Sequence, residues 1–307
     1  MYIVTGGAGF VGSHIVHRLV SEGKQVTVID NLFSGDERNL EGVKDKIKFI
    51  KANAGSISQV AETPEAVIHE GVYSSSPMYK ENPFLTAKAI EDMVGVLEYC
   101  RAKDCKLVFA SSSSLYNGVE PPQKESARIK VTDYYTEARY AMERLAELYA
   151  KLYGVHIIAL RYFSIYGERE FYKGKYANLI SQFLWEMKEG KQPLVFGDGK
   201  QARDFVYVED VVDANLLAAK SRVRFGVFNV GTGREITIND MVGILNSKLG
   251  TSIAPAYKEN TIKNYVARTC ADTKKTEKKL GWTAKVSLED GIGKLVEYYK
   301  NKATSAQ

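Results

Sequence analysis

Met1-Tyr-Ile-Val-Thr5, followed directly by Gly6-Gly7-Ala8-Gly9-Phe10-Val11-Gly12, is the stretch that decides the fold. An amphipathic run continues to Glu22, and Val26-Thr-Val-Ile-Asp30 comes next. This order predicts a strand, a glycine turn, a helix and a second strand. In a G-x-x-G-x-x-G turn, the first glycine permits a tight turn and the second lets the backbone approach a ligand. The third lets the helix pack closely on the sheet.

The turn and its flanks predict a dinucleotide site. A diphosphate at the helix start, near Phe10 and Val11, would meet unpaired N–H groups and the positive end of the helix dipole. Asp30 ends the second strand about twenty residues further on, where its carboxylate can accept a hydrogen bond from an adenosine ribose hydroxyl. A 2′-phosphate would meet this anion, so the pattern favours NAD over NADP.

The composition is that of an ordinary globular chain of 307 residues, with 42 basic and 37 acidic side chains and a net charge of +5. This small excess indicates a mixed, solvated surface rather than a nucleic-acid groove. Cys100, Cys105 and Cys270 lack metal-ligand spacing, so we expect no metal site and free thiols in a reducing compartment. The chain starts with a predicted strand and has no apolar run near the roughly 20 residues of a membrane span. We therefore expect a cytoplasmic protein without a signal peptide or membrane contact.

Strand and helix patterns alternate through the first half of the chain. Apolar stretches predict strands at 48–51, 66–69, 106–110 and 155–160, and amphipathic runs predict helices at 83–103 and 134–153. This alternation predicts an α/β protein with a Rossmann-like, doubly wound parallel sheet. Beyond Phe163 the rhythm becomes irregular, which indicates a smaller C-terminal substrate-binding lobe. We expect an NAD-binding domain over 1–163, its sheet completed by a segment near 204–232 that includes a strand at 225–230. Residues 164–203 and 233–307 are expected to form the lobe.

Two further motifs follow at positions where doubly wound sheets bind ligands. Ser111-Ser-Ser-Ser114 comes after the strand at 106–110, and Tyr135 begins a helix with Arg139 four residues later on the same face. With the glycine turn, these motifs resemble the extended short-chain dehydrogenase/reductase superfamily, in its NAD-dependent epimerase/dehydratase family. The resemblance covers nearly the whole chain and includes Gly197-Asp-Gly199, Arg203-Asp-Phe-Val-Tyr-Val208, Asp210-Val-Val212, Phe228-Asn-Val-Gly-Thr-Gly233, Ala271-Asp272 and Leu280-Gly-Trp282.

The resemblance implies an acid/base tyrosine that acts on a sugar hydroxyl while NAD takes a hydride. The family pattern places this tyrosine at Tyr135 and its partner serine at Ser112, with Ser113 as a second contact. A free tyrosine has a pKa of about 10, so a tyrosine base needs positive charge nearby. Arg139 stands where the family usually has lysine. Arginine keeps the charge but does not relay a proton as an ammonium can.

Three other positions depart from the family pattern. Asn53 stands where an aspartate usually follows the third strand, and its amide could still bond adenine. The asparagine that is usual early in the long helix falls on Ala89. The usual His-Leu-Ala-Ala after the fourth strand is here His69-Glu70-Gly71-Val72.

The resemblance also implies the remaining contacts. For NAD it implies Gly6, Gly9, Phe10, Val11, Gly12, Asp30, Asn31, Ser34, Gly35, Asn53, Ala54, His69, Glu70, Gly71, Tyr135, Arg139 and Phe163. For the nucleotide sugar it implies Ser113, Ser164, Lys173, Asn178, Phe196, Arg203 and Lys263, with Arg268 an alternative to Lys263 and Tyr207 an alternative to Phe196. Arg203 is the expected phosphate ligand, because a guanidinium fork matches phosphate oxygens. By analogy with the family, the helices that begin at 83 and 134 should form the four-helix bundle of a homodimer.

Two branches of the family fit the chain. The overall pattern and the serine run look like UDP-glucose/UDP-galactose 4-epimerases, isomerases that need one base. His69-Glu-Gly71 and Tyr166-Gly-Glu-Arg-Glu170 with Lys173 resemble ADP-glycero-manno-heptose 6-epimerases, in which a lysine matching Lys173 is a second base. We predict a UDP-hexose 4-epimerase with tightly bound NAD. The alternatives are a heptose-type 6-epimerase, another nucleotide-sugar epimerase or dehydratase, an oxidoreductase that releases NADH, and a non-catalytic NAD-binding regulator.

Overall fold

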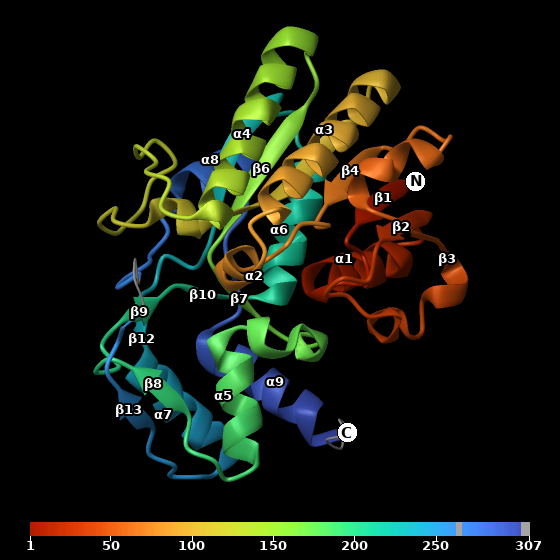
Figure 1. Ribbon diagram of the computed structural model, residues 1–307. Coiled ribbons are helices and arrows are strands. Elements are labelled where there is room, and N and C mark those ends of the chain that lie inside the picture. The colour runs from red at the N-terminus through yellow and green to blue at the C-terminus, as the bar shows by residue number, and fades with distance from the viewer. Residues whose placement is uncertain (262–265, 302–307) are drawn as a thin grey trace.

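A parallel sheet of seven strands forms the centre of the molecule. The computed structural model describes residues 1–261 and 266–301, and in these the sheet has the order β11–β6–β5–β4–β1–β2–β3 (Figure 1). Every neighbouring pair is parallel. The order reverses between β1 and β4, so the crevice at their carboxyl ends is a ligand position in such sheets. The strands are β1 Tyr2–Thr5, β2 Val26–Asp30, β3 Ile47–Lys51, β4 Ala66–His69, β5 Lys106–Ser112, β6 Ile157–Tyr162 and β11 Phe225–Val230.

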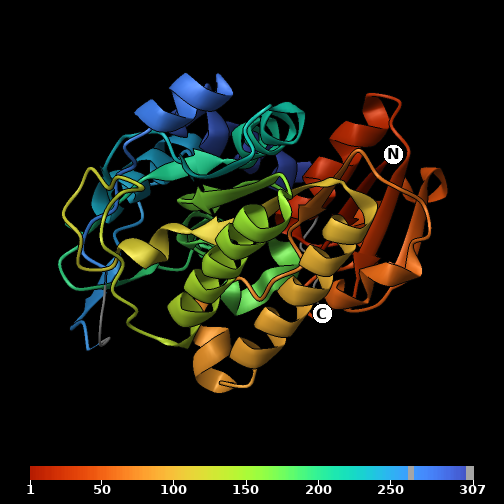
Figure 2. The same ribbon diagram turned by 90° about the horizontal axis from the view of Figure 1, so that it is seen from above.

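Helices of the described chain cover both faces of this sheet. α1 (Phe10–Ser21) and α6 (Val208–Lys220) bury apolar side chains against one face, and α3 (Leu85–Lys103) and α4 (Tyr134–Tyr153) against the other. α3 and α4 lie side by side, as Figure 2 shows. α4 begins at a capping box of Asp133 and Thr136, which sets the position of Tyr135 in its first turn.

A second core lies beyond the carboxyl edge of the sheet, in the lower part of Figure 1. It is built mainly by α5 (Leu179–Lys188), α7 (Ile238–Leu249) and α9 (Leu288–Asn301). Three strand pairs adjoin it: β7 Ser164–Tyr166 with β10 Phe205–Tyr207, β8 Leu194–Phe196 with β13 Ala256–Lys258, and β9 Ala202–Arg203 with β12 Ile236–Thr237. The other elements are α2 Ser76–Glu81, α8 Lys274–Leu280 and 3₁₀ helices at Glu37–Leu40, Lys44–Lys46, Ala54–Gln59, Ser113–Tyr116 and Phe171–Tyr176.

The predicted doubly wound α/β fold is confirmed. The predicted strand at 225–230 is β11, which pairs with β6 and completes the sheet. Within the same predicted segment, β10 pairs instead with β7 outside the central sheet. The second core forms around α5, α7 and α9. We propose that it is the hydrophobic core of the substrate-binding lobe expected over 164–203 and 233–307.

The described residues show three further features. None of their helices combines the length and the hydropathy that crossing a membrane requires. They also contain no group of three His, Cys, Asp or Glu side chains arranged to hold a metal ion. Cys100, Cys105 and Cys270 are free thiols.

Candidate active site

Close backbone contacts shape the glycine turn. Gly6 has a φ of +68°, and a Cβ there would lie 2.5 Å from the Gly71 nitrogen. A Cβ on Gly12 would lie 2.1 Å from the Gly6 carbonyl oxygen, so this glycine allows α1 to approach the turn. Gly9 is the N-cap residue of α1, and in the described chain no side chain caps this end and no acid lies in its first turn. The uncapped N-terminus therefore suits a diphosphate.

Asp30 ties the turn to the second strand. Its Oδ2 accepts a hydrogen bond from the Ala8 N–H at 2.9 Å, and its Oδ1 accepts from the Leu32 N–H at 2.7 Å. Burial raises the pKa of Asp30, and these backbone donors act against that rise. The carboxylate lines a cavity next to the turn, where a ribose hydroxyl could reach it.

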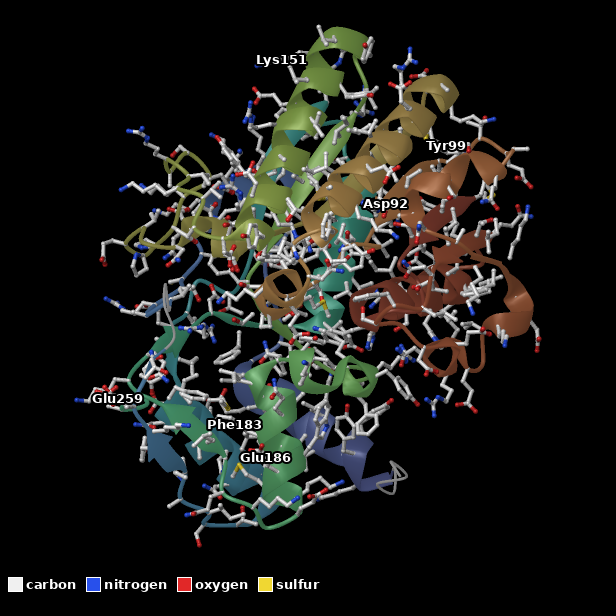
Figure 3. All side chains as sticks on the ribbon, viewed as in Figure 1. Asp92, Tyr99, Lys151, Phe183, Glu186 and Glu259 are labelled. Carbon is white, nitrogen blue, oxygen red and sulfur yellow. The ribbon has the colours of Figure 1, made fainter. Side chains whose placement is uncertain are left out.

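This hollow, the Asp30 cavity, extends from the turn to α3. Asp92 (labelled in Figure 3) reaches it from α3, and its Oδ1 accepts from the Gly55 N–H at 2.9 Å. Ala89, the expected position of the family's asparagine, is instead buried in the core. Asp92 is therefore the α3 residue at this cavity. The full lining is Gly6, Gly9, Ile29, Asp30, Asn31, Phe33, Ser34, Gly35, Ala52, Ala54, Glu70, Gly71, Val72, Tyr73 and Asp92.

A second hollow, the Tyr135 cavity, has a volume of about 370 Å³. Ser112 reaches it from the end of β5 and Tyr135 from the first turn of α4. Ser112 Oγ accepts from the Ser114 N–H at 3.1 Å, and the Tyr135 ring meets Tyr79 edge-on with 5.4 Å between the ring centres. The two cavities share Gly6, Gly9, Ser34, Glu70 and Val72, so they form one groove that joins the glycine turn to Ser112 and Tyr135.

Arg139 lies one helical turn after Tyr135 and is only 2% exposed. Its Nη1 and Nη2 donate to the carbonyl oxygens of Ala110 and Tyr73, both at 2.9 Å. Its guanidinium carbon lies 5.1 Å from the centre of the Tyr135 ring. Burial disfavours the cation, but the adjacent tyrosines and Glu70 outweigh this effect and raise the pKa of Arg139. Backbone carbonyls thus hold a permanent cation next to the tyrosine.

A fully partnered charge network lies beneath the serine run. Glu143, one turn beyond Arg139, accepts from Arg161 twice, with Nε–Oε1 at 2.9 Å and Nη2–Oε2 at 2.6 Å. Ser111 Oγ donates to Glu143 Oε1 at 2.5 Å, and Arg161 Nη1 donates to Tyr116 Oη at 2.8 Å. Because Ser111 precedes Ser112 and Tyr116 follows it, this network anchors the serine run from the core side.

The opposite wall of the Tyr135 cavity comes from the segment after β6. Lys173 Nζ forms a salt bridge with Glu170 Oε1 at 3.0 Å and lies 5.5 Å from the centre of the Phe10 ring. Glu170 also accepts from the Asn178 N–H, which links this pair to the start of α5. The lining on this side is Phe163, Ser164, Ile165, Glu170, Lys173, Tyr176, Ala177 and Asn178.

Residues 2–231 match the NAD dependent epimerase/dehydratase family. The chain belongs to this family. NAD is therefore its cofactor, and the uncapped glycine turn and Asp30 fit it. Over 98% of its length the chain is 35% identical to "Putative UDP-glucose 4-epimerase" from Methanocaldococcus jannaschii, of which it covers 99%. It is 30% identical, also over 98% of its length, to UDP-glucuronic acid decarboxylase 1 from Arabidopsis thaliana, of which it covers 70%.

Solved structures agree with this assignment. UDP-glucose 4-epimerase from Thermotoga maritima, solved with UDP-glucose, has a TM-score of 0.91 and 34% identity, covering 97% of this chain and 98% of that one. UDP-N-acetylglucosamine 4-epimerase from Methanobrevibacter ruminantium has a TM-score of 0.92 and 29% identity, covering 97% of each. ADP-L-glycero-D-manno-heptose-6-epimerase from Helicobacter pylori has a TM-score of 0.88 and 27% identity, covering 98% and 96%. The family is therefore settled, and the names of its members differ in the sugar.

Two residues expected at the cofactor line neither cavity. His69 is fully buried, and a hydrogen bond of 2.6 Å joins its Nδ1 to Thr5 Oγ1. Burial lowers the pKa of His69 to about 3, with the charge of Arg139 adding to the effect, so the ring is neutral. Asn53 Oδ1 accepts from Asn31 Nδ2 at 2.9 Å. The His69 side chain therefore links β4 to β1, and the Asn53 side chain links two loops beside the groove.

Two residues expected at the substrate also line neither cavity. Phe196 lies in β8, where its strand pairs with β13. Arg203 lies in β9, and its Nη1 donates to the carbonyl oxygens of Ala202 and Ala267 at 2.9 and 3.2 Å. Lys263 lies outside the described residues.

The sequence interpretation missed several lining residues, among them Ser74, Ser75, Ser76, Tyr162, Tyr176 and Asp92. The three serines follow β4 closely, as Ser113 and Ser114 follow β5. The rule that polar residues after a strand face the ligand edge could therefore have found them. Tyr162 and Asp92 belong to regular elements, and no local sequence signal distinguishes them from core residues.

Proposed function

We propose that this protein is a UDP-hexose 4-epimerase that interconverts UDP-glucose and UDP-galactose. The observation that carries the proposal is the convergence of Tyr135, Ser112 and the glycine turn on one groove. The names of the M. jannaschii and T. maritima proteins support the choice of reaction and sugar.

The residues of the chain divide the chemistry between them. NAD, when bound, accepts a hydride from the sugar carbon and later returns it. The Tyr135 phenolate takes the proton of the sugar hydroxyl, while Ser112 Oγ hydrogen-bonds the same oxygen. The Arg139 cation stabilises that phenolate. The tyrosine returns the proton when the ketone is reduced on its other face, so one base serves both directions.

The nucleotide diphosphate must stay bound while the hexose turns. Ser164, Lys173 and Asn178 line the wall opposite Tyr135. Asn178 caps α5 by accepting from the Ile180 N–H at 3.0 Å, so the α5 N-terminus adjoins the cavity. We assign these residues and Ser113 to the substrate, because a helix N-terminus and a lysine both favour phosphate.

Incubation of the purified protein with UDP-galactose and NAD tests this function. We expect UDP-glucose as product, and a loss of about 10²- to 10⁴-fold in turnover for Tyr135→Phe. UDP-N-acetylgalactosamine and UDP-glucuronic acid are the parallel substrates. Turnover of one of these without UDP-galactose would overturn the sugar, and full turnover by Tyr135→Phe would overturn the mechanism.

A heptose-type 6-epimerase is the second candidate, because Lys173 lines the same cavity as Tyr135. In a one-base 4-epimerase, Lys173→Met should raise KM more than it lowers kcat. In a two-base enzyme, the same variant should lose kcat with little change in KM. ADP-heptose as substrate distinguishes the two directly.

We also propose a cytoplasmic homodimer built on α3 and α4. Phe84, Leu148, Leu152 and Tyr153 are exposed on or beside these helices, with Leu152 at 67%. A four-helix bundle would bury them, and the free thiols suit a reducing compartment. Light scattering should give a dimer for the natural chain and a monomer for Leu152→Glu.

A further inference from the structure

Glu70 is an acid that lines both halves of the groove. It follows β4 directly, and its N–H donates to the Thr5 carbonyl oxygen at 3.0 Å. A Cβ on Gly6 would lie 2.6 Å from the Glu70 carbonyl carbon. Asp30 and Asp92 line only the Asp30 cavity. Glu70 therefore lies where the two halves of the groove join, against the glycine turn.

One hydroxyl group holds the Glu70 side chain. Tyr162 Oη donates to Glu70 Oε1 at 2.6 Å. The Asn215 side-chain amide donates in turn to Tyr162 Oη at 2.8 Å and to the Val211 carbonyl oxygen at 2.9 Å. One carboxyl oxygen is thus fixed from the core side, while the residue stays partly exposed to the groove.

Among the described residues, no cation forms a direct ion pair with Glu70. Arg139 gives its Nη groups to backbone carbonyls, and Lys173 is paired with Glu170. His69 is neutral, and the first turn of α1 holds no acid. Burial raises the pKa of Glu70 to about 7, although the Tyr162 hydrogen bond and the charge of Arg139 both lower it. The other titratable side chains that line the groove are Asp30, Tyr73, Asp92, Tyr135 and Tyr176.

We propose that Glu70 binds NAD as a neutral carboxylic acid, so that NAD binding is accompanied by uptake of a proton at this side chain. The proposal rests on the NAD dependence of the family and is independent of the sugar. A diphosphate at the glycine turn brings negative charge next to Glu70, and like charge favours the protonated acid. Protonation also supplies an O–H donor, which a carboxylate lacks, for a ribose or phosphate oxygen. The proton comes from solvent, and no other bond changes.

Titration calorimetry with NAD measures this uptake directly. Nucleotide-free full-length protein is titrated at pH 7.5 in two buffers that differ in ionisation enthalpy. We expect uptake of at least about half a proton per NAD, and an affinity that falls between pH 7 and 9 by as much as about tenfold per pH unit. Glu70→Gln should bind NAD without measurable uptake and with nearly constant affinity. No uptake by the natural chain, release of a proton, or equal uptake in both proteins would overturn the proposal.

Asp92→Asn is the matched control, because burial also raises the pKa of this groove acid. The proposal expects unchanged uptake in Asp92→Asn, and loss of uptake there would transfer the role to Asp92 and refute it for Glu70. Tyr162→Phe should lower the uptake, because without that hydroxyl Glu70 is already more protonated before NAD binds. Infrared spectra of the NAD-loaded protein provide a readout that needs no nucleotide-free chain. They should show the C=O stretch of a protonated carboxyl that Glu70→Gln removes, and its absence from the natural chain would contradict the proposal.

Discussion

Two arginine–glutamate sets lie near each other and are organised differently. Arg161 and Glu143 are in direct contact through two N–H···O bonds, and each side chain is 4% exposed. Arg139 and Glu70 influence each other without such contact. Arg139 bonds to the carbonyl oxygens of Ala110 and Tyr73, and Glu70 accepts from a tyrosine hydroxyl.

This difference separates charge used for structure from charge kept for ligands. In the Arg161–Glu143 pair, each ion offsets the desolvation of the other, and neither residue lines the groove. Arg139 and Glu70 both line the groove, so their charges act on whatever binds there. A cation next to Tyr135 stabilises a phenolate, and a carboxyl group next to the glycine turn avoids like charge beside a diphosphate only by taking up a proton.

Arg139→Met should have the largest effect. It tests whether the charge of Arg139 serves the reaction rather than the structure. Without the cation, the phenolate loses its stabilisation and turnover should fall by about 10²- to 10⁴-fold. Arg139→Lys keeps a positive charge and should recover part of the loss. Steady-state kinetics with UDP-galactose measure this, with thermal unfolding to show that each variant is folded. Turnover within tenfold of the natural chain for Arg139→Met would show that the cation is structural.

Glu143→Gln tests whether the Arg161–Glu143 pair stabilises the folded protein. It leaves Arg161 as a buried ion without its partner, and the free energy of unfolding should fall by about 3–5 kcal/mol. Glu147→Gln is the control, because Glu147 pairs with Lys151 at 2.6 Å on the exposed side of the same helix (Figure 3). That change should cost less than about 1 kcal/mol. Urea denaturation of both variants measures the two changes in the free energy of unfolding. Equal losses of stability would contradict a special role for the buried pair.

Glu70→Gln tests the role of Glu70 through the pH dependence of stability. The folded chain raises the pKa of Glu70 from 4.5 to about 7, so it binds this proton more tightly than the unfolded chain. Stability contributed by this site is therefore present below pH 4.5 and is lost as pH rises toward 7. At pH 8 the variant should be more stable than the natural chain by up to about 3 kcal/mol, and at pH 4 the two should unfold alike. A gain of equal size at both pH values would point to packing instead.

Adjacent serines give the smallest expected effect. Ser111→Ala removes a hydrogen bond to the Glu143 carboxylate and should cost about 1.5–3 kcal/mol of stability. Its turnover should stay within a few-fold of the natural value. Ser112→Ala, the matched control, should show the reverse pattern, with stability nearly unchanged and turnover lowered. Denaturation and steady-state kinetics are measured on the same preparations. If both variants behaved alike, the assignment of a structural role to Ser111 and a catalytic role to Ser112 would be refuted.

Local rules identified much of the fold and the centre of the site. Gly6 and Gly12 leave no room for a Cβ, so their spacing is tied to one turn geometry. Asp133 caps α4 two residues before Tyr135, which places that ring in the first turn. The motifs predicted Arg203 and Phe196 at the substrate, but neither residue lines the two cavities, because which cavity a short strand borders depends on tertiary packing.

The doubly wound sheet, the dinucleotide turn and the pairing of Tyr135 with a cation could all be predicted from the sequence. Each of them depends on residues that are close together in the chain. Only the tertiary structure decided that Asp92 reaches the groove and that Arg161 neutralises Glu143. It alone decided that Glu70 has a hydroxyl rather than an ion as its partner. Tyr162 is 92 residues from Glu70 in the sequence. Charge pairing and pKa values depend on such distant contacts and on burial, and neither is encoded in local spacing.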